Sequence, residues 1–325
     1  MVPLIYAGID EAGYGPMFGP LVVACAAFTL HAYEPSKSAP NLWKLLARAV
    51  CRSRSDRRRR IAVEDSKSLK GPVGGAVHPL RHLERGVLAF RASSPADIPA
   101  NDAALLDQLH ISQPAHRWYD GAVNLPVGQS LHELQIAIGM LKRAMTSCAL
   151  NCPMMQAEVI DAGTFNSQID VMHSKAAVNL CAAMRLVDAV WRRWPDAHPR
   201  IVVDRQSGRT HYLRPLQLSY PDAELTILNE DERFSRYHLR RGSAELTITF
   251  TTEAERQHLP VALASMTAKY VRELLMLRMN RFFRSHMPEL KPTAGYVQDG
   301  RRYLADIEPL IRRLGLDRRQ LVRES

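Results

Sequence analysis

The segment from Ile5 to Pro16 constrains the fold of this 325-residue chain more than any other part of it. An apolar run ends in two adjacent carboxylates, Asp10 and Glu11, and a turn that contains glycine follows at once. Because acidic residues are disfavoured inside a strand, we expect the pair at a strand end, where carboxylates can bind a hard cation through oxygen. A second apolar run begins at Leu21, and the short connection predicts an antiparallel pair of strands within residues 4–28.

The composition is that of a soluble globular protein, with 46% hydrophobic and 23% charged residues. The formal net charge of +10 favours an anionic partner, with nucleic acid as the first candidate and an acidic membrane surface as the second. The sequence contains no apolar run of about 18–20 residues, the length that a membrane span requires. Five scattered cysteines indicate reduced thiols, so we expect a cytoplasmic protein, and we also expect a monomer.

The first half of the chain contains an unusual stretch inside what we interpret as one domain over residues 1–325. Residues 72–160 form a probable insertion, since much of this stretch is rich in Pro, Gly, Ser and His and has weak periodicity. Within it, Ser130 and Glu133 have the spacing of a capping box and predict a helix over 131–146. The arginine run over 52–60 is either a solvated loop or an arm that contacts phosphates.

The second half alternates helices and strands, which indicates an α/β fold. Apolar spacing predicts helices over 167–194 and 262–284 and a shorter one near 301–314. Strands are expected at 201–204, 224–229 and 244–251, and the first of these ends at Asp204.

Strand-end acids of this kind are suited to the hydrolysis of a phosphodiester by two divalent ions, one that activates water and one that stabilises the leaving oxygen. Asp10, Glu11 and Asp204 would supply three carboxylates, and the segment before the 262–284 helix would supply a fourth. Rival machinery is absent from the sequence: it contains no phosphate-binding P-loop, no His-Glu-x-x-His motif and no Gly-x-Ser-x-Gly elbow.

These residues resemble the motifs of the type 2 ribonucleases H, that is, ribonucleases HII and HIII. The opening motif is Gly8-Ile9-Asp10-Glu11-Ala12-Gly13-Tyr14-Gly15-Pro16, continued by Phe18-Gly19-Pro20. Further matches follow in the family's order: Asp65-Ser66-Lys67-Ser68-Leu69, Ile169-Asp170, Val203-Asp204, Ala264-Ser265-Met266-Thr267-Ala268-Lys269 and Gly295-Tyr296. The resemblance implies a ribonuclease H-like fold, with a mixed five-stranded sheet flanked by helices and a helical C-terminal part.

The resemblance also implies a metal site and its ligands. Asp10, Glu11 and Asp204 would bind Mg²⁺ or Mn²⁺. The family's fourth acid lies ten residues before the serine of the Ala-Ser-x-x-Ala-Lys motif, which gives Glu255 where the family has aspartate. Glu253 competes for this role, because the local spacing differs by one residue.

The remaining matches imply contacts with substrate. The Gly13-Tyr14-Gly15 turn would read the 2′-hydroxyl at an RNA–DNA junction through its backbone, as a Gly-Arg-Gly turn does in the family, and a 2′-hydroxyl is the group that distinguishes RNA from DNA. Tyr296 would stack on the adjoining deoxyribose, or else be an ordinary core aromatic. Lys67 and Lys269 would contact phosphates, or else be surface lysines. Ser265 would bond a phosphate, or else merely cap its helix.

The expected function is therefore an endonuclease that hydrolyses the RNA strand of an RNA–DNA hybrid, or cuts at embedded ribonucleotides. The alternative is a catalytically weak nucleic-acid-binding protein that retains the fold, which the large insertion and the glutamate at position 255 would favour. A nuclease of the same fold that acts on DNA junctions is a third possibility.

Overall fold

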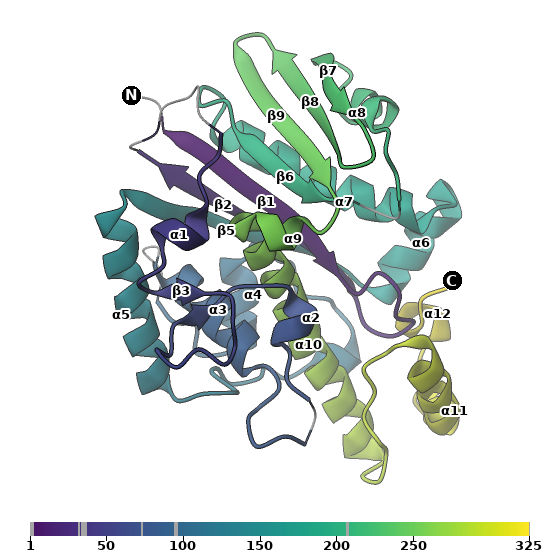
Figure 1. The fold of residues 1–325 in the computed structure, drawn as a ribbon. Helices are drawn as coiled ribbons and strands as arrows, with labels where there is room; N and C mark the ends of the chain where they lie inside the picture. Colours follow the sequence, from purple (N-terminus) through teal and green to yellow (C-terminus); the bar gives the residue numbers. More distant parts are fainter. Residues whose placement is uncertain are drawn as a thin grey trace.

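The computed structural model describes residues 3–31, 33, 38–72, 74–93, 97–205 and 208–324. A mixed sheet forms its centre and helices cover both of its faces (Figure 1). The sheet strands are β1 (Leu4–Ala12), β2 (Leu21–Leu30), β5 (Leu150–Ile160), β6 (Arg200–Asp204), β7 (Glu224–Glu230), β8 (Phe234–Arg241) and β9 (Ala244–Thr251). A separate pair consists of β3 (Val50–Cys51) and β4 (Ile61–Ala62).

The longer helices lie between these strands and after them. They are α3 (Arg81–Ser93), α5 (Leu131–Ser147), α6 (Ala162–Met172), α7 (Lys175–Arg193), α10 (Leu259–His286) and α11 (Val297–Leu314). The shorter ones are α1 (Leu42–Leu45), α2 (Ser66–Leu69), α4 (Asp102–Gln108), the 3₁₀-helix η1 (Arg117–Tyr119), α8 (Leu213–Ser219), α9 (Ala254–Gln257) and α12 (Arg318–Leu321). None of the helices in the described part of the chain is both long and apolar enough to cross a membrane.

The strands lie in the order β5-β2-β1-β6-β9-β8-β7. The expected antiparallel pairing of β1 and β2 is confirmed, whereas β1, β6 and β9 run parallel. The α/β fold class, with flanking helices and a helical C-terminal part, is likewise confirmed. The expected number of five strands was wrong, because the described residues form a sheet of seven: β7 and β8 extend it beyond β9 as an antiparallel hairpin.

Two separate hydrophobic cores lie on the two faces of the sheet, and β1 contributes alternate side chains to each. Leu4 and Tyr6 belong to the core that contains α3, α5 and α10, whereas Ile5, Ala7 and Ile9 belong to the core that contains α7. This alternation follows from the two-residue period of a strand. Because both of its faces are covered, β1 is an almost continuous apolar run up to the acids.

Gly8 allows α10 to approach β1 closely. A Cβ atom at position 8 would lie 2.1 Å from the backbone nitrogen of Val261, a distance that no side chain tolerates. Glycine is therefore required here by the contact between strand and helix. The consequence for function is that the N-terminal part of α10, which carries Ser265, lies directly against the strand that ends in Asp10.

Two sequence expectations on local structure need correction: the single helix over 167–194 and the weak periodicity of residues 72–160. The helix expected over 167–194 is two helices, because His173 takes a left-handed conformation with φ of 51° and ends α6, after which Ser174 caps α7. Within residues 72–160 the described part contains α3, α4, η1 and α5, and β5 forms an edge of the central sheet. The predicted 131–146 helix is confirmed as α5, with the expected capping box.

Candidate metal and nucleic-acid site

Four carboxylates gather at the edge of the sheet where the parallel strands end. Asp10 and Glu11 are at the end of β1, Asp204 is the last residue of β6, and Glu255 lies in α9 directly after β9. In the parallel pairing Ile9 lies opposite Val203, so Asp10 and Asp204 follow side by side. The carboxyl ends of neighbouring parallel strands meet at one edge, and the structure brings these predicted residues together there.

The strand period directs the two adjacent acids to different partners. The Asp10 carboxylate accepts a hydrogen bond from Ser265 of α10, which lies on one face of the sheet. It also accepts a bond of 2.7 Å from the backbone N–H of Glu11. Glu11 lies close to Asn179 of α7, on the other face, and to the ammonium group of Lys67. The pair therefore joins both layers of helices to one site.

Asp204 orders the segment that carries the fourth acid. Its Oδ1 accepts a hydrogen bond of 3.0 Å from the backbone N–H of Ala254. This bond holds the start of α9, so that the negative charge of Glu255 acts on both Glu11 and Asp204. Glu253 is different: its side chain is 63% exposed and pairs with Arg256 at 2.9 Å. Of the two candidates, Glu255 is the one whose position fits the carboxylate cluster.

Burial and mutual repulsion disfavour the charged forms of these acids. Burial, followed by the charges of Glu11 and Asp204, raises the pKa of Asp10 well above its usual value. Burial is also the main cause that raises the pKa of Glu11 and of Glu255, and it raises that of Asp204 to about 7. Crowded carboxylates stay ionised only when cations compensate them, so this arrangement is suited to divalent cations with oxygen ligands.

A buried amide strengthens the fit to a cation. Asn179 is fully buried beside Glu11, and neither its oxygen nor its nitrogen has a hydrogen-bond partner of good geometry among the described residues. Leaving such a group unsatisfied costs about 1–3 kcal/mol. An amide oxygen can be a ligand of a hard cation, either directly or through water. The cluster therefore offers one amide oxygen in addition to its four carboxylates.

Two buried arginines, Arg272 and Arg323, donate hydrogen bonds to the backbone of the glycine turn after β1 and of the segment that follows it. Gly13 has φ of 89°, and a Cβ there would lie 2.6 Å from the carbonyl oxygen of Pro20, so only glycine fits. The guanidinium of Arg323 donates to the carbonyl oxygens of Gly13 and Pro16. That of Arg272 donates to Phe18 O at 3.0 Å. The backbone of the predicted 2′-hydroxyl reader is thus fixed before any substrate arrives.

Tyr296 lies beside this turn because the loop before α11 is bonded to it. The carbonyl oxygen of Gly295 accepts bonds from Met17 N at 2.9 Å and from Phe18 N at 3.2 Å. Tyr296 itself is 50% exposed, which fits a stacking residue and not the alternative of a core aromatic. The ammonium group of Lys269 lies 6.0 Å from the centre of its ring.

The other predicted substrate residues differ in their exposure. Lys67 is exposed next to the acids, and Tyr14 and Gly15 lie at the surface of the turn. Lys269 is 7% exposed and pairs with Glu273 at 3.0 Å, so it is not a surface lysine. Ser265 is buried and lies 3.0 Å from the hydroxyl of Ser66, which connects α10 to α2.

A basic groove continues from Lys67 into the arginine run. Arg52, Arg54 and Lys70 line it together with Lys67. Arg52 stacks on Trp43, pairs with Glu64 at 2.9 Å and donates to the carbonyl oxygen of Arg256 in α9. The start of the run is therefore anchored to the helix that carries Glu255, which a freely solvated loop would not be.

Three residues of the site were not predicted from the sequence: Asn179, Arg272 and Arg323. Each lies far in sequence from the motif that it supports. Arg323, for example, contacts Gly13 over a separation of 310 positions. Asn179 offered one weak signal, since an amide on the buried face of a helix is unusual among its apolar neighbours.

Comparisons with known proteins agree with the resemblance read from the sequence. Residues 7–35 match the family model described as Ribonuclease HII. This range covers most of β1, the glycine turn and β2, so the similarity to type 2 ribonucleases H is confirmed at the segment that carries Asp10 and Glu11. No curated protein matches the chain in sequence.

Solved structures of the same group show a distant likeness. RNase HII from Archaeoglobus fulgidus, solved with PCNA, is 14% identical with a TM-score of 0.41, covering 98% of this chain and 93% of that one. Bst-RNase HIII in complex with Mn²⁺ is 17% identical with a TM-score of 0.44, covering 98% and 66% respectively. Ribonuclease H2 from Pyrococcus horikoshii OT3 is 15% identical with a TM-score of 0.39, covering 98% and 92%. TM-scores below 0.5 give no residue-by-residue correspondence.

Proposed function

We propose that this chain, which is similar to ribonuclease HII over residues 7–35, is a metal-dependent endonuclease that hydrolyses the RNA strand of RNA–DNA hybrids. The observation that carries the proposal is the convergence of Asp10, Glu11, Asp204 and Glu255 at the carboxyl edge of the parallel strands. Four acids from three separate segments have raised pKa values here, which means that the folded protein disfavours their charged forms. A purely structural role does not require such a destabilising arrangement.

The four carboxylates and the Asn179 amide would hold Mg²⁺ or Mn²⁺. Divalent ions bound there supply charge neutralisation of the phosphodiester and a nucleophile at neutral pH. The protein's own contribution is to fix the oxygens: Ser265 and the Glu11 N–H orient Asp10, and Ala254 N orients Asp204. These bonds set the positions of the ligands before substrate binds, which is how a site avoids reorganisation during the reaction.

The basic groove would bind the duplex backbone. Arg52, Arg54, Lys67 and Lys70 line the groove, Lys67 lies close to Glu11, and the chain carries a net charge of +10. Phosphate contacts of this kind position a nucleic acid without reading its sequence, and they predict an affinity that falls steeply with salt. For the arginine run, this favours the phosphate-contacting alternative over a solvated loop.

Discrimination of RNA from DNA would rest on the fixed turn and on Tyr296. The backbone of Gly13-Tyr14-Gly15 would read a 2′-hydroxyl, and the exposed ring of Tyr296 would stack on the next sugar. Lys269 would contact a phosphate of the substrate. It is also held near the ring of Tyr296 by its pairing with Glu273, so its positive charge would support this ring. We propose further that the protein acts as a cytoplasmic monomer.

The first test is cleavage of an end-labelled DNA duplex that carries one ribonucleotide, beside a long RNA–DNA hybrid, with Mg²⁺ or Mn²⁺. We expect a cut on the 5′ side of the ribonucleotide that is lost in the Asp10→Asn variant. Cleavage of the long hybrid alone would retain the enzyme but remove the junction-reading role of the turn. Binding without cleavage in either metal would instead identify a nucleic-acid-binding protein that keeps the fold.

A further inference from the structure

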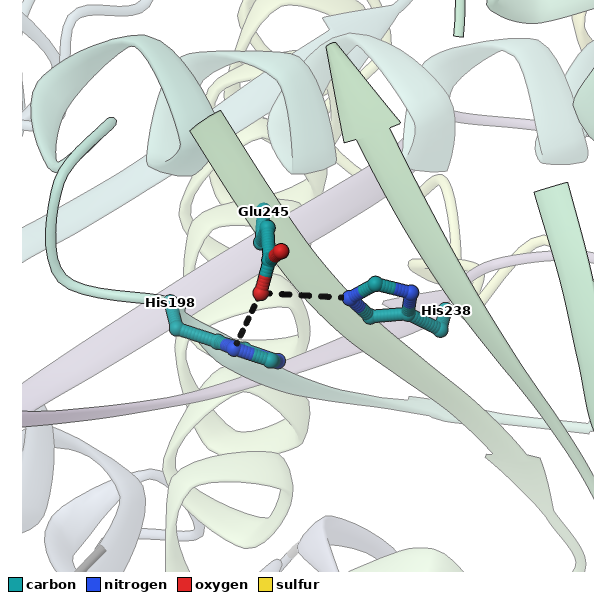
Figure 2. Close-up of side chains that lie close together, drawn as sticks. All are labelled: His198, His238 and Glu245. Carbon is teal, nitrogen blue, oxygen red and sulfur yellow. Dashed lines mark ion pairs between the residues drawn. The ribbon is translucent and has the colours of Figure 1, made fainter. Parts of the chain in front are cut away.

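A second group of possible metal ligands lies at the opposite end of the sheet from the acids. His198 precedes β6, His238 lies on β8, and Glu245 lies near the start of β9 (Figure 2). β6 and β9 both run from this group towards the carboxylate cluster, and Asp204 marks the far end of β6. Figure 2 shows the three side chains turned towards one point, from three different segments.

The distances within the group fit a small tetrahedral ion. Oε2 of Glu245 lies 3.2 Å from Nδ1 of His198 and 3.4 Å from Nε2 of His238. One atom from each residue lies within 4.8 Å of the others. A tetrahedral centre with bonds of about 2.0–2.1 Å separates its ligand atoms by about 3.3–3.4 Å, the spacing found from Glu245 to each imidazole.

A further contact fixes the orientation of His198. Its Nε2 lies 2.9 Å from the hydroxyl of Thr247, two residues after Glu245 on β9. If Nε2–H donates to that hydroxyl, the lone pair of Nδ1 is directed to the point shared with Glu245 and His238. Metal-binding histidines almost always use their second nitrogen in this way, which sets both tautomer and ring orientation.

The alternative reading of the group is a pair of ion pairs between protonated histidines and Glu245. Both imidazoles contact the same oxygen, Oε2 of Glu245, so two protonated rings would share a single negative charge. Two imidazole rings 5.3 Å apart would also repel each other if both were charged. Neutral imidazoles beside a carboxylate are the form that a metal ion requires.

We propose that His198, His238 and Glu245 bind one zinc ion, with water in the fourth position. Imidazole and carboxylate ligands in this number are typical of zinc sites that keep an open coordination position. The carboxylate cluster, which contains oxygen ligands only, is suited to Mg²⁺ or Mn²⁺ instead. Bound zinc would tie the loop before β6 to the β8–β9 hairpin, so we expect it to stabilise this side of the sheet.

The test is zinc binding by the metal-free, full-length protein in excess Mg²⁺, measured by isothermal titration calorimetry. Mg²⁺ occupies the carboxylate cluster and competes poorly for imidazole, so the heat reports the second site. We expect one zinc ion per chain. His238→Asn and Glu245→Gln should each weaken zinc binding by more than about 100-fold, because even loss of an outer partner costs about 10–100-fold.

The matched control is His211→Asn. His211 also lies beside a glutamate, Glu230, at 2.9 Å, but at the other end of strands β7 to β9, and no second histidine completes that pair among the described residues. Zinc binding should be unchanged in this variant. Absence of zinc binding by the wild-type protein, or an equal loss in His211→Asn, would overturn the proposal, and neither result bears on hybrid cleavage.

A gentler variant tests the geometry without removing a ligand. Thr247→Val keeps a β-branched residue on β9 but removes the hydroxyl that contacts His198 Nε2. We expect zinc binding to weaken by about 10–100-fold and the zinc-induced rise in Tm to shrink accordingly. Unchanged affinity in Thr247→Val would contradict the assignment of Nδ1 as the ligand atom.

Discussion

The two ends of the central sheet present different ligands on the same strands. At the carboxyl end, Asp10, Asp204 and Glu255 offer oxygen only, and Asp10 is 8% exposed. At the opposite end, Glu245 and two histidines offer nitrogen and oxygen, and the side chain of His198 is 45% exposed. β9 serves both ends, since it begins beside one group and leads into α9 at the other.

In the two proposals, one scaffold would separate two cation chemistries. The buried acids repel one another, and a bound cation would compensate their charge, whereas each of the two histidines contacts Glu245 and His198 also contacts Thr247. Hard oxygen ligands favour Mg²⁺ or Mn²⁺, and imidazole favours zinc. A variant that changes both hybrid cleavage and zinc binding would contradict this separation of the two ends.

The largest expected effect is the loss of cleavage in Asp204→Asn. Metal-ion catalysis supplies several kcal/mol, and each 1.4 kcal/mol is tenfold in rate, so we expect a fall of about 1,000-fold. His238→Asn should change the rate by less than about twofold, since it lies at the other end of the sheet. Single-turnover cleavage of a hybrid in Mg²⁺ measures both, and a large loss in His238→Asn would merge the two sites into one.

Metal removal should change the pH dependence of stability. Burial raises the pKa of Asp204 to about 7 in the folded state, so the native protein holds this proton more tightly than the unfolded chain. Asp204 by itself therefore lowers the free energy of unfolding as pH rises from about 4 to about 7, by at most about 4 kcal/mol. Below about pH 4 the penalty disappears, because both states are protonated.

Urea denaturation with a chelator and with Mg²⁺, at several pH values, measures this dependence. Mg²⁺ should remove most of it, since the ion binds the charged carboxylates. Asp204→Asn should make the chelator curve less steep, whereas Asp306→Asn, at an exposed carboxylate paired with Arg302, should leave it unchanged. Equal curves for wild type and Asp204→Asn would contradict the proposed electrostatic origin.

A smaller effect is expected from the fourth acid. Glu255→Gln should slow cleavage by about 100-fold, because one negative ligand is lost from the cluster. Glu255→Asp keeps the charge and should lose less than about tenfold. Glu253→Gln is the matched control, because this exposed residue pairs with Arg256, and its rate should match wild type. The reverse order of the two glutamine variants would assign the role to Glu253.

The smallest expected effect concerns Tyr296. Stacking on a nucleic acid contributes about 1–3 kcal/mol by alanine substitution, so Tyr296→Ala should raise KM for a junction substrate by about tenfold. Tyr296→Phe keeps the ring and should differ from wild type by less than about twofold. If the phenylalanine variant loses as much as the alanine variant, the hydroxyl, and not the ring, makes the contact.

The sequence was sufficient to predict which acids gather at the carboxyl end of the sheet. It was insufficient to predict the residues that surround and orient them. Asp10, Glu11 and Asp204 lie at the ends of apolar runs, and these runs form strands that carry the acids at their ends in the structure. The choice between Glu253 and Glu255 depended on the direction in which a short helix leaves β9, which no local pattern encodes. Asn179 and Arg323 act across more than 150 positions of chain, so only the fold reveals them.

Two strands of the central sheet and one helix boundary escaped prediction for physical reasons. β8 buries Ser235, Tyr237 and Leu239 on one side, but arginines alternate with them, so the segment contains no apolar run that would predict a strand. β5 contains Asn151 and Pro153, both of which are unfavourable in strands, and it tolerates them at the edge of the sheet. The break between α6 and α7 lies at His173, whose left-handed conformation interrupts an otherwise continuous apolar stripe.

The close contact of Gly8 with α10 protects β1 against a pairing error. A slip of one residue would bring Ala7 or Ile9 against the backbone of Val261, where even one added carbon has no room. The same slip would turn Asp10 towards α7 and Glu11 towards α10, exchanging their partners. A mispaired strand is thus rejected by shape before its charges are tested, so a chain that has folded at all has its acids on the correct sides.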